Sequence, residues 1–138
     1  MDRLKTSVYR KERFNAAHRL HNPALSEVEN KEIFGKCNNP NFHGHNYEII
    51  VKVTGFVDEQ TGYVIDMKIL HKILHEHIVE KFDHRNLNLD TEEFKEVNPT
   101  AENIARVCYE IIRSKINASL DLKIFLYETE RNYVEFPA

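Results

Sequence analysis

YEIIVKVTGFV, residues 47–57, carries the clearest two-residue periodicity in the chain. Apolar residues occupy every second position from Tyr47 to Val53, and the other face carries polar residues such as Glu48 and Lys52. Because successive side chains of a strand point to opposite faces, one face is apolar and the other is polar. The stretch therefore predicts a half-buried β-strand.

Further strands are predicted on both sides of this one. Residues 6–14, TSVYRKERF, combine β-branched and aromatic side chains with charge, which indicates an edge or partly exposed strand. Residues 122–127 alternate again, a turn follows at residues 129–132, and residues 133–136 return. This last region predicts a C-terminal β-hairpin.

Two helices are predicted between the second and third strands. Asp66 can cap a helix that runs to about Phe82, with apolar residues at three- and four-residue steps. Residues 98–100, Asn-Pro-Thr, can open a second helix with a buried apolar stripe, because proline is tolerated in a first turn and Asn98 or Thr100 can cap it. Residues 21–42 have turn chemistry and are expected to hold no regular element. The order predicts an α+β fold, an antiparallel sheet covered by two helices on one face.

The composition bounds the size of the protein and its partners. Of 138 residues, 41% are hydrophobic, enough for one core, so we expect a single domain over residues 1–138. Charges of both signs are mixed, and the formal net charge is -3. No basic surface attracts phosphate backbones or anionic lipid, so nucleic acid and membranes are not expected partners.

The chain lacks sequence signals for secretion or membrane insertion. No apolar run approaches the roughly 20 residues that cross a bilayer, and residues 1–5, MDRLK, lack the apolar start of a signal peptide. The two cysteines, Cys37 and Cys108, suggest no disulfide framework. These features predict a cytoplasmic protein with reduced thiols.

Three of the eight histidines predict a metal site. His43 and His45 are two residues apart in an extended stretch, so both imidazoles project to the same side, and Gly44 between them allows close approach. If the first strand pairs with the Tyr47 strand, His18 at its end reaches the same point. Three histidines with an open fourth position form a typical catalytic zinc site, although His-x-His alone fits core or surface histidines equally well.

Cys37 is the second candidate for chemistry. It lies in a polar, Asn-rich loop, and nearby positive charge or metal lowers the pKa of a thiol; Lys36 and a histidine-bound zinc would supply both. The spacing to His43 allows the loop to bring the thiol near the metal without making it a ligand. Cys108, on the apolar stripe of the second helix, is interpreted as a buried inert thiol.

Asp83 and His84 form a third candidate. A carboxylate can fix the tautomer of a histidine, and such a pair moves protons near neutral pH. Adjacent residues face opposite ways in a strand, so this role needs an irregular segment, which residues 83–86 provide. A solvated helix end is the commoner explanation for such a pair.

Glu128 is separated from Leu122 and Leu126 by even numbers of residues, so in a strand all three side chains point to the same face. Glu128 therefore places a carboxylate at the end of the buried face of the third strand. A buried charge requires a partner. Either an internal cation pairs with Glu128, or a ligand donates N–H groups to it. The residues alone favour the internal pair.

His71 and His75 are four residues apart on the first predicted helix, a spacing that can bind metal. They share a polar face with Lys68 and Lys72, and no carboxylate or cysteine completes a site there. We interpret these two histidines, together with His77, as part of a solvated helix face.

Five motifs across nearly the whole chain resemble those of the 6-pyruvoyl-tetrahydropterin synthase family, which also contains 6-carboxytetrahydropterin synthases. The motifs are FNAAHRL at residues 14–20, FGKCNNPNFHGHNY at 34–47, DHRNL at 83–87, PTAEN at 99–103 and YET at 127–129. One such motif would be weak evidence. All five in order make a highly specific resemblance.

The resemblance implies roles for the matching residues. They are the zinc ligands His18, His43 and His45, the catalytic residues Cys37, Asp83 and His84, and the pterin-binding residues Glu128, Thr100 and Glu102. Cys37 matches the family's base, and Asp83 with His84 completes its proton-transfer triad. Glu128 matches the carboxylate that anchors the pterin ring.

The resemblance also implies a fold and a reaction. The fold is the tunnelling fold, an α+β fold whose four-stranded antiparallel sheet has two helices on one face, with subunits assembling into a barrel. Two trimers form a homohexamer with active sites between subunits. The implied enzyme uses Zn²⁺ and converts 7,8-dihydroneopterin triphosphate to 6-pyruvoyl-tetrahydropterin with loss of triphosphate.

Other functions stay open at this point. A 6-carboxytetrahydropterin synthase of queuosine biosynthesis acts on the same substrate. The interval from Cys37 to His43 resembles 6-pyruvoyl members, residues 98–100 resemble the bacterial branch, and Ala101 stands where animal relatives often have a second threonine. A non-catalytic zinc module predicts Cys37 as a fourth ligand. A zinc hydrolase gives Cys37 and Glu128 no role and ranks last.

Overall fold

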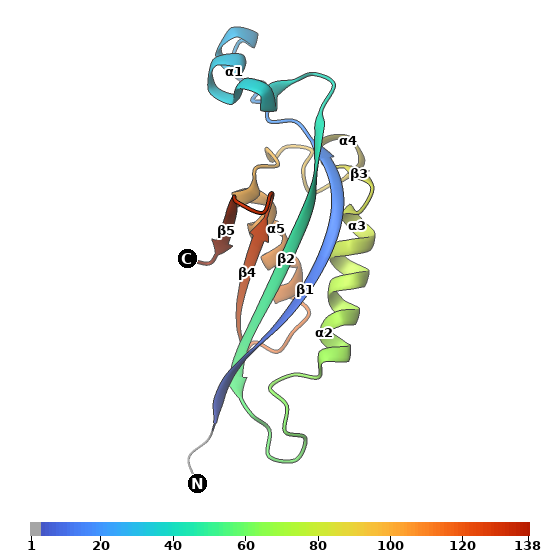
Figure 1. The fold of residues 1–138 in the computed structure, drawn as a ribbon, viewed down its shortest axis with the longest axis vertical. Helices are drawn as coiled ribbons and strands as arrows, with labels where there is room; N and C mark the ends of the chain where they lie inside the picture. The colour runs from blue at the N-terminus through green and yellow to red at the C-terminus, as the bar shows by residue number, and fades with distance from the viewer. Residues whose placement is uncertain (1–3) are drawn as a thin grey trace.

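The structure, a computed structural model, describes residues 4–138, which contain one open sheet with the strand order β3-β1-β2-β4-β5. The long strands β1 (Lys5–His18) and β2 (His43–Phe56) pair antiparallel along their whole lengths. β4 (Asp121–Tyr127) pairs antiparallel with β2, and β5 (Tyr133–Phe136) completes the predicted C-terminal hairpin at one edge. Figure 1 shows the four strands side by side.

A fifth strand corrects the predicted four-stranded antiparallel sheet. β3 (Arg85–Asn86) pairs with β1 in parallel, opposite Ala16 and Ala17, and the short helix α4 (Leu87–Asp90) follows it. The prediction of four strands was therefore wrong by one. A two-residue strand leaves no periodic pattern in the sequence, because alternation is recognisable only over about four to eight residues.

The two predicted helices are present. The first consists of α2 (Met67–Leu74), a wider π-helical turn η2 (His75–Val79) and α3 (Glu80–Phe82), and the second is α5 (Ala101–Arg113). In Figure 1, α2 and α3 run alongside β1, whereas α5 lies behind β4. Within residues 4–138, no helix has both the length and the apolar character that a membrane span requires.

Side chains cap both helices as predicted. Asp66 accepts a hydrogen bond from the Lys68 N–H at 2.9 Å at the start of α2. Thr100 accepts one from the Asn103 N–H at 3.2 Å at the start of α5. Each cap satisfies an N–H group that has no partner inside its helix, so the helix start is fixed relative to the sheet.

The core lies between the helices and one face of the sheet. The four apolar residues at alternate positions from Tyr47 to Val53 are fully buried, which confirms the predicted face of β2. Leu70 of α2 and Ile104 of α5 belong to the same buried cluster, so both helices cover this face. Each such side chain stabilises the fold by about 1.5–3 kcal/mol, which makes the β1–β2 pair a rigid support for residues at its end.

Residues 21–42 contain helices, so the expectation of no regular element was wrong. α1 (Glu27–Phe34) and the single 3-10 turn η1 (Gly35–Asn38) occupy most of this segment. The overlooked signal is a capping box: Ser26 Oγ accepts from the Glu29 N–H at 3.1 Å, and Glu29 Oε1 accepts from the Ser26 N–H at 3.2 Å.

Candidate functional site

Three histidines converge at one end of the β1–β2 pair. The antiparallel register places His18 directly opposite His43, and His45 lies two residues further along β2 on the same face. The ring centroids are 4.5 Å apart for His18 and His43, and 5.0 Å apart for each of the other two pairs. The prediction that pairing of the two strands brings these imidazoles together is confirmed.

Gly44 allows the two strands to approach closely between these histidines. A Cβ atom at this position would lie 3.3 Å from the carbonyl oxygen of Ala16. A side chain would therefore require the β1 backbone at Ala16 to shift by a few tenths of an ångström. The glycine in the His-Gly-His motif thus serves strand packing at the site.

Burial keeps the imidazoles of His18 and His43 in the neutral form that binds metals. His18 is 1% exposed, and burial lowers the pKa of this imidazole to about 4. Burial, followed by the neighbouring His45, lowers the pKa of His43. A neutral imidazole has a free lone pair, so at neutral pH both groups are ready to bind a cation.

Two neighbours contact the His18 ring, and one of them, a backbone carbonyl, fixes its tautomer. Its Nδ1 lies 2.8 Å from the carbonyl oxygen of Pro99 and 3.2 Å from the phenol oxygen of Tyr47. A carbonyl can only accept, so Nδ1 carries the proton and Nε2 keeps the lone pair. Sequence reasoning identified neither neighbour as functional. Tyr47 lies on the same strand face as His43 and His45, which could have revealed it. Pro99 opens the motif at residues 99–103, but no sequence pattern indicates that its backbone carbonyl contacts His18.

We expect Tyr47→Phe to weaken zinc binding about tenfold to a hundredfold, because the His18 ring loses one of its two orienting contacts. The phenyl ring still fills the core, so the fold should remain. Titration calorimetry of Zn²⁺ into chelator-treated protein measures the change. Tyr9→Phe, which alters an exposed phenol elsewhere on β1, is the matched control; equal Kd values for the two variants would contradict the role of Tyr47.

The histidine cluster has the chemistry of a transition-metal site. One nitrogen from each of His18, His43 and His45 lies within 4.8 Å of the other two. His43 Nδ1 and His45 Nε2 are buried without a hydrogen-bond partner among the described residues, whereas buried polar atoms are normally paired. Three imidazole nitrogens suit zinc, and Cys37 does not belong to this group of ligand atoms.

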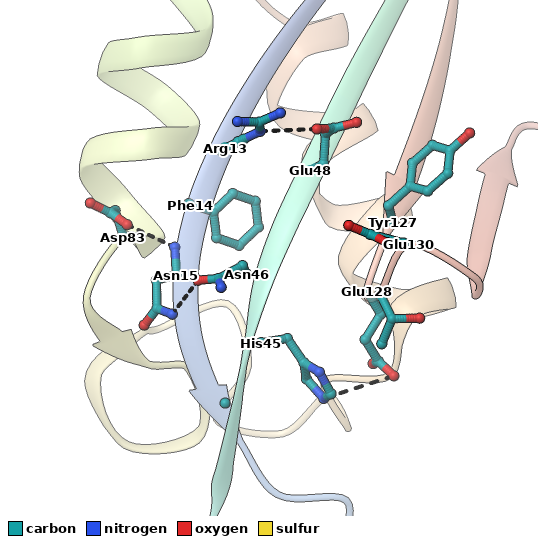
Figure 2. A pocket seen from close by; sticks show the side chains of 12 residues that line it. Arg13, Phe14, Asn15, His45, Asn46, Glu48, Asp83, Tyr127, Glu128 and Glu130 are labelled. Atoms are coloured by element: carbon teal, nitrogen blue, oxygen red, sulfur yellow. Dashed lines mark hydrogen bonds and ion pairs between the residues drawn. The ribbon is translucent and has the colours of Figure 1, made fainter.

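Glu128 stands beside the cluster. Its carboxylate oxygens lie 3.9 Å from His18 Nε2 and 3.9 Å from His45 Nε2. Figure 2 shows Glu128, directly after β4, and His45 of β2 pointing toward each other. Within residues 4–138, no lysine or arginine forms an ion pair with Glu128. The internal cation pair that the residues alone favoured is therefore not formed, and the carboxylate remains able to accept N–H groups of a ligand.

Glu128 and His45 line a cavity of about 810 Å³, part of which is drawn in Figure 2. Arg13 and Glu48, paired at 3.0 Å, lie on its wall, as does Asp83. A second cavity, of about 820 Å³, is lined by residues of α1 and η1, with Cys37, His43 and His45. His45 borders both cavities, so the histidine cluster lies next to each of them.

Cys37 lies outside the ligand cluster, and its role as a base stays a prediction. It is partly exposed on η1 and shares the second cavity with His43 and His45. Cys108 is fully buried on α5, and burial raises the pKa of this thiol to about 12. The predicted burial of Cys108 is confirmed.

The structure forms the Asp83–His84 pair. His84 Nδ1 lies 2.8 Å from Asp83 Oδ2, and Asp83 Oδ1 accepts from the Asn15 N–H at 2.7 Å. The Asn15 N–H, and then the His84 contact, lower the pKa of Asp83, so this carboxylate is charged and orients the imidazole. His84 has a φ of 59°, in a turn between α3 and β3, which is the irregular segment that the pairing required. Its side chain is 82% exposed.

Within one chain, the remaining predicted residues do not meet at a single point. Cys37 lines the second cavity and Asp83 lines the first, while His84 lines neither. Thr100 is engaged in capping α5, and Glu102 is exposed in its first turn. Neither of these two lines either cavity, so their contact with a pterin stays a prediction.

The histidines of α2 and η2 do not form a second metal cluster among the described residues. His71 and His75 stack with ring centroids 5.8 Å apart and are exposed, in agreement with a solvated face. His71 Nδ1 lies 2.7 Å from a carboxylate oxygen of Glu12 on β1, a contact that the sequence did not reveal. This pair links α2 to the sheet.

Comparison with known proteins adds independent information. The sequence profile of the 6-pyruvoyl tetrahydropterin synthase family matches residues 7–138. Human 6-pyruvoyl tetrahydrobiopterin synthase is 40% identical over 134 residues, which cover 97% of this chain and 92% of the human protein. A Caenorhabditis elegans protein named putative 6-pyruvoyl tetrahydrobiopterin synthase is 46% identical over 127 residues, 91% of this chain and 90% of the relative.

A solved structure agrees with these matches. The Caenorhabditis elegans 6-pyruvoyl tetrahydropterin synthase superposes with a TM-score of 0.92 at 42% sequence identity. The alignment covers 99% of this chain and 98% of that one. The similarity therefore extends over nearly the whole chain, without a large insertion or deletion.

Proposed function

The chain belongs to the 6-pyruvoyl tetrahydropterin synthase family, and on that premise we propose that it is a carbon-oxygen lyase acting on phosphates. Its substrate is 7,8-dihydroneopterin triphosphate, and its products are 6-pyruvoyl-tetrahydropterin and triphosphate. The observation that carries this proposal is the three-histidine cluster. Two of its members, His43 and His45, line a cavity together with Cys37, whose sulfur is not one of the clustered ligand atoms.

In this proposal the histidine cluster and Glu128 bind different parts of the substrate. His18, His43 and His45 would hold Zn²⁺, and a bound zinc would supply Lewis acidity to the hydroxyls of the substrate side chain. Glu128 accepts two N–H groups from the edge of the pterin ring, a charge-assisted arrangement. Its distance of 3.9 Å from His18 and His45 supports a ring bound directly beside the side-chain hydroxyls.

Cys37 and the Asp83–His84 pair perform the proton transfers. Cys37 removes a carbon-bound proton from the substrate side chain, and this proton is later returned to the ring. His84, oriented by Asp83, relays protons while triphosphate leaves. Thr100 and Glu102 supply further contacts to the pterin. The reaction is redox-neutral and needs no nicotinamide.

Two subunits complete each active site. Residues 1–138 act as a single domain, trimers close their sheets into a barrel, and two trimers form a homohexamer. Within one chain Cys37 and His84 belong to different places, and the exposure of the His84 side chain supports its use by a neighbouring chain. The sheet is open, and unpaired strand edges such as β5 are natural sites for pairing with another copy.

The alternatives receive less support. The relatives described above are named for the 6-pyruvoyl activity, which does not favour a 6-carboxytetrahydropterin synthase of queuosine biosynthesis. A non-catalytic zinc module would need Cys37 as a fourth ligand, and the ligand atoms that cluster come from His18, His43 and His45.

We expect the zinc-loaded protein to convert 7,8-dihydroneopterin triphosphate to a pterin with a three-carbon diketo side chain, with one triphosphate released per turnover. Mass spectrometry of the products, with separate detection of triphosphate, measures this outcome. Acetaldehyde together with a carboxylated pterin would instead identify the 6-carboxy reaction. Absence of both products from metal-loaded protein would contradict the assignment to this enzyme type.

A further inference from the structure

Asn38 follows Cys37 directly and is buried, although its loop is exposed. It is 3% exposed, whereas Asn39 and Pro40 after it are exposed. A buried amide is costly unless its N–H groups find acceptors. We propose that Asn38 is a positioning residue for the reaction proposed above, on which this inference rests: it holds Cys37 at a fixed place relative to the strand end that carries His18.

The Asn38 side chain uses both of its N–H groups on the segment that follows His18. Its Nδ2 donates to the carbonyl oxygen of Leu20 at 2.8 Å. The same nitrogen donates to Nδ1 of His21 at 3.0 Å. Because both acceptors lie within three residues of His18, the amide joins the Cys37 loop to the end of β1.

Two further hydrogen bonds reinforce this connection from the backbone. The Leu20 N–H donates to the carbonyl oxygen of Cys37 at 2.8 Å. Arg19 Nε donates to the carbonyl oxygen of Asn38 at 2.9 Å. Four hydrogen bonds thus tie two consecutive residues of the loop to three consecutive residues after His18. We call this set the Asn38 clamp.

The clamped segment is itself held in place. The Arg19 N–H donates to Asn88 Oδ1 at 2.8 Å, and Asn88 Nδ2 donates back to the Arg19 carbonyl oxygen at 2.9 Å. His18, directly before this segment, is fixed by its contact with Pro99. Residues 18–19 are thus held by α4 and by Pro99, and the clamp holds the Cys37 backbone against this fixed segment.

Along the chain, Cys37 is joined to His43 by the irregular residues 39–42 and to His18 by the longer segment 19–36, which contains α1. Phe42, the last of residues 39–42, has a φ of 67°, in the left-handed region that a bulky side chain rarely occupies. A base must stand within hydrogen-bond reach of the proton that it removes. Because an error of about 1 Å can reduce a rate about a hundredfold, the clamp sets how well Cys37 works while leaving the metal ligands intact.

Asn38→Ser, compared with Asn30→Ser, tests the clamp. Asn30 is also buried, at 0% exposure, and its side chain makes four hydrogen bonds. All four stay within residues 22–30, so this control removes an equally buried amide without touching Cys37. The measurements are zinc content, kcat, KM, and the alkylation rate of each cysteine by iodoacetamide, resolved by peptide mass spectrometry.

We expect Asn38→Ser to lower kcat about tenfold to a hundredfold, with a smaller change in KM, and to raise the alkylation rate of Cys37 severalfold at unchanged zinc content. Asn30→Ser should leave both rates as in the unaltered protein. Buried Cys108 reports unfolding, since it reacts only when the core opens. Equal Cys37 alkylation and kcat in the two variants would overturn the proposal.

Arg19→Ala keeps the test decisive where Asn38→Ser does not fold. It removes one hydrogen bond of the clamp, from Arg19 Nε to the Asn38 carbonyl oxygen. We therefore expect the Cys37 alkylation rate to rise less than in Asn38→Ser, and no rise at all would overturn the proposal. Alkylation requires no pterin. A protein without synthase activity would therefore refute the proposed function, while the alkylation comparison would still decide whether Asn38 positions Cys37.

Discussion

Cys37→Ala is expected to abolish turnover and to leave the bound metal in place. The thiol lines the cavity that His43 and His45 also line, but it is not among the clustered ligand atoms. Loss of a general base lowers kcat about 10²- to 10⁴-fold, whereas zinc content should stay at one ion per chain. Steady-state kinetics and elemental analysis of the same preparation measure both quantities.

Two further variants separate the base from the metal. His43→Ala should lose zinc and turnover together, because only two of the three clustered nitrogens remain. Cys108→Ala removes a buried thiol and should keep both zinc and kcat, at some cost in thermal stability. A Cys37→Ala protein with full activity would remove Cys37 from the mechanism, and a zinc-free one would make the thiol a ligand.

The parts of the fold that were predictable are those in which a periodic pattern decides burial. The alternation from Tyr47 to Val53 predicted β2, and the caps Asp66 and Thr100 predicted the starts of α2 and α5. In each case the element expected from neighbouring side chains is also the one that buries the apolar residues in the folded chain. Local sequence patterns were therefore sufficient to predict these elements.

Other elements depend on contacts that no local pattern encodes. β3 is only two residues long and exists because Arg85 and Asn86 pair with the end of β1. α1 has a capping box at Ser26, yet its surface is polar and mostly exposed, so an apolar stripe could not reveal it. Elements without an apolar face are held by tertiary contacts and by caps alone.

The metal site was predictable through one conditional step. His43 and His45 share a face in any strand, but His18 joins them only if β1 pairs with β2 in the observed register. Pro99, which orients His18, is 81 residues away in sequence and acts through its backbone carbonyl. A backbone group carries no residue signature, so this part of the site could be found only from the structure.

Mixed oligomers should recover activity from two inactive variants. Cys37→Ala and His84→Ala each lack one group of the proposed site, and the two groups lie in different places of one chain. If each active site combines Cys37 of one subunit with His84 of a neighbour, a mixed oligomer contains some sites in which both groups are intact. In random mixtures about a quarter of the sites are complete, because each site draws its two groups from separate subunits.

Co-expression of the two variants with different affinity tags, followed by purification on both tags, isolates these mixed oligomers for kinetic assay. The matched control combines Cys37→Ala with His43→Ala. These two residues line one cavity of the same chain, so every site in that mixture lacks one of them and no activity should return. Activity that returns only in the mixture of Cys37→Ala with His84→Ala would support a site shared between subunits. If neither mixture regains activity, one chain supplies both Cys37 and His84 to the same site.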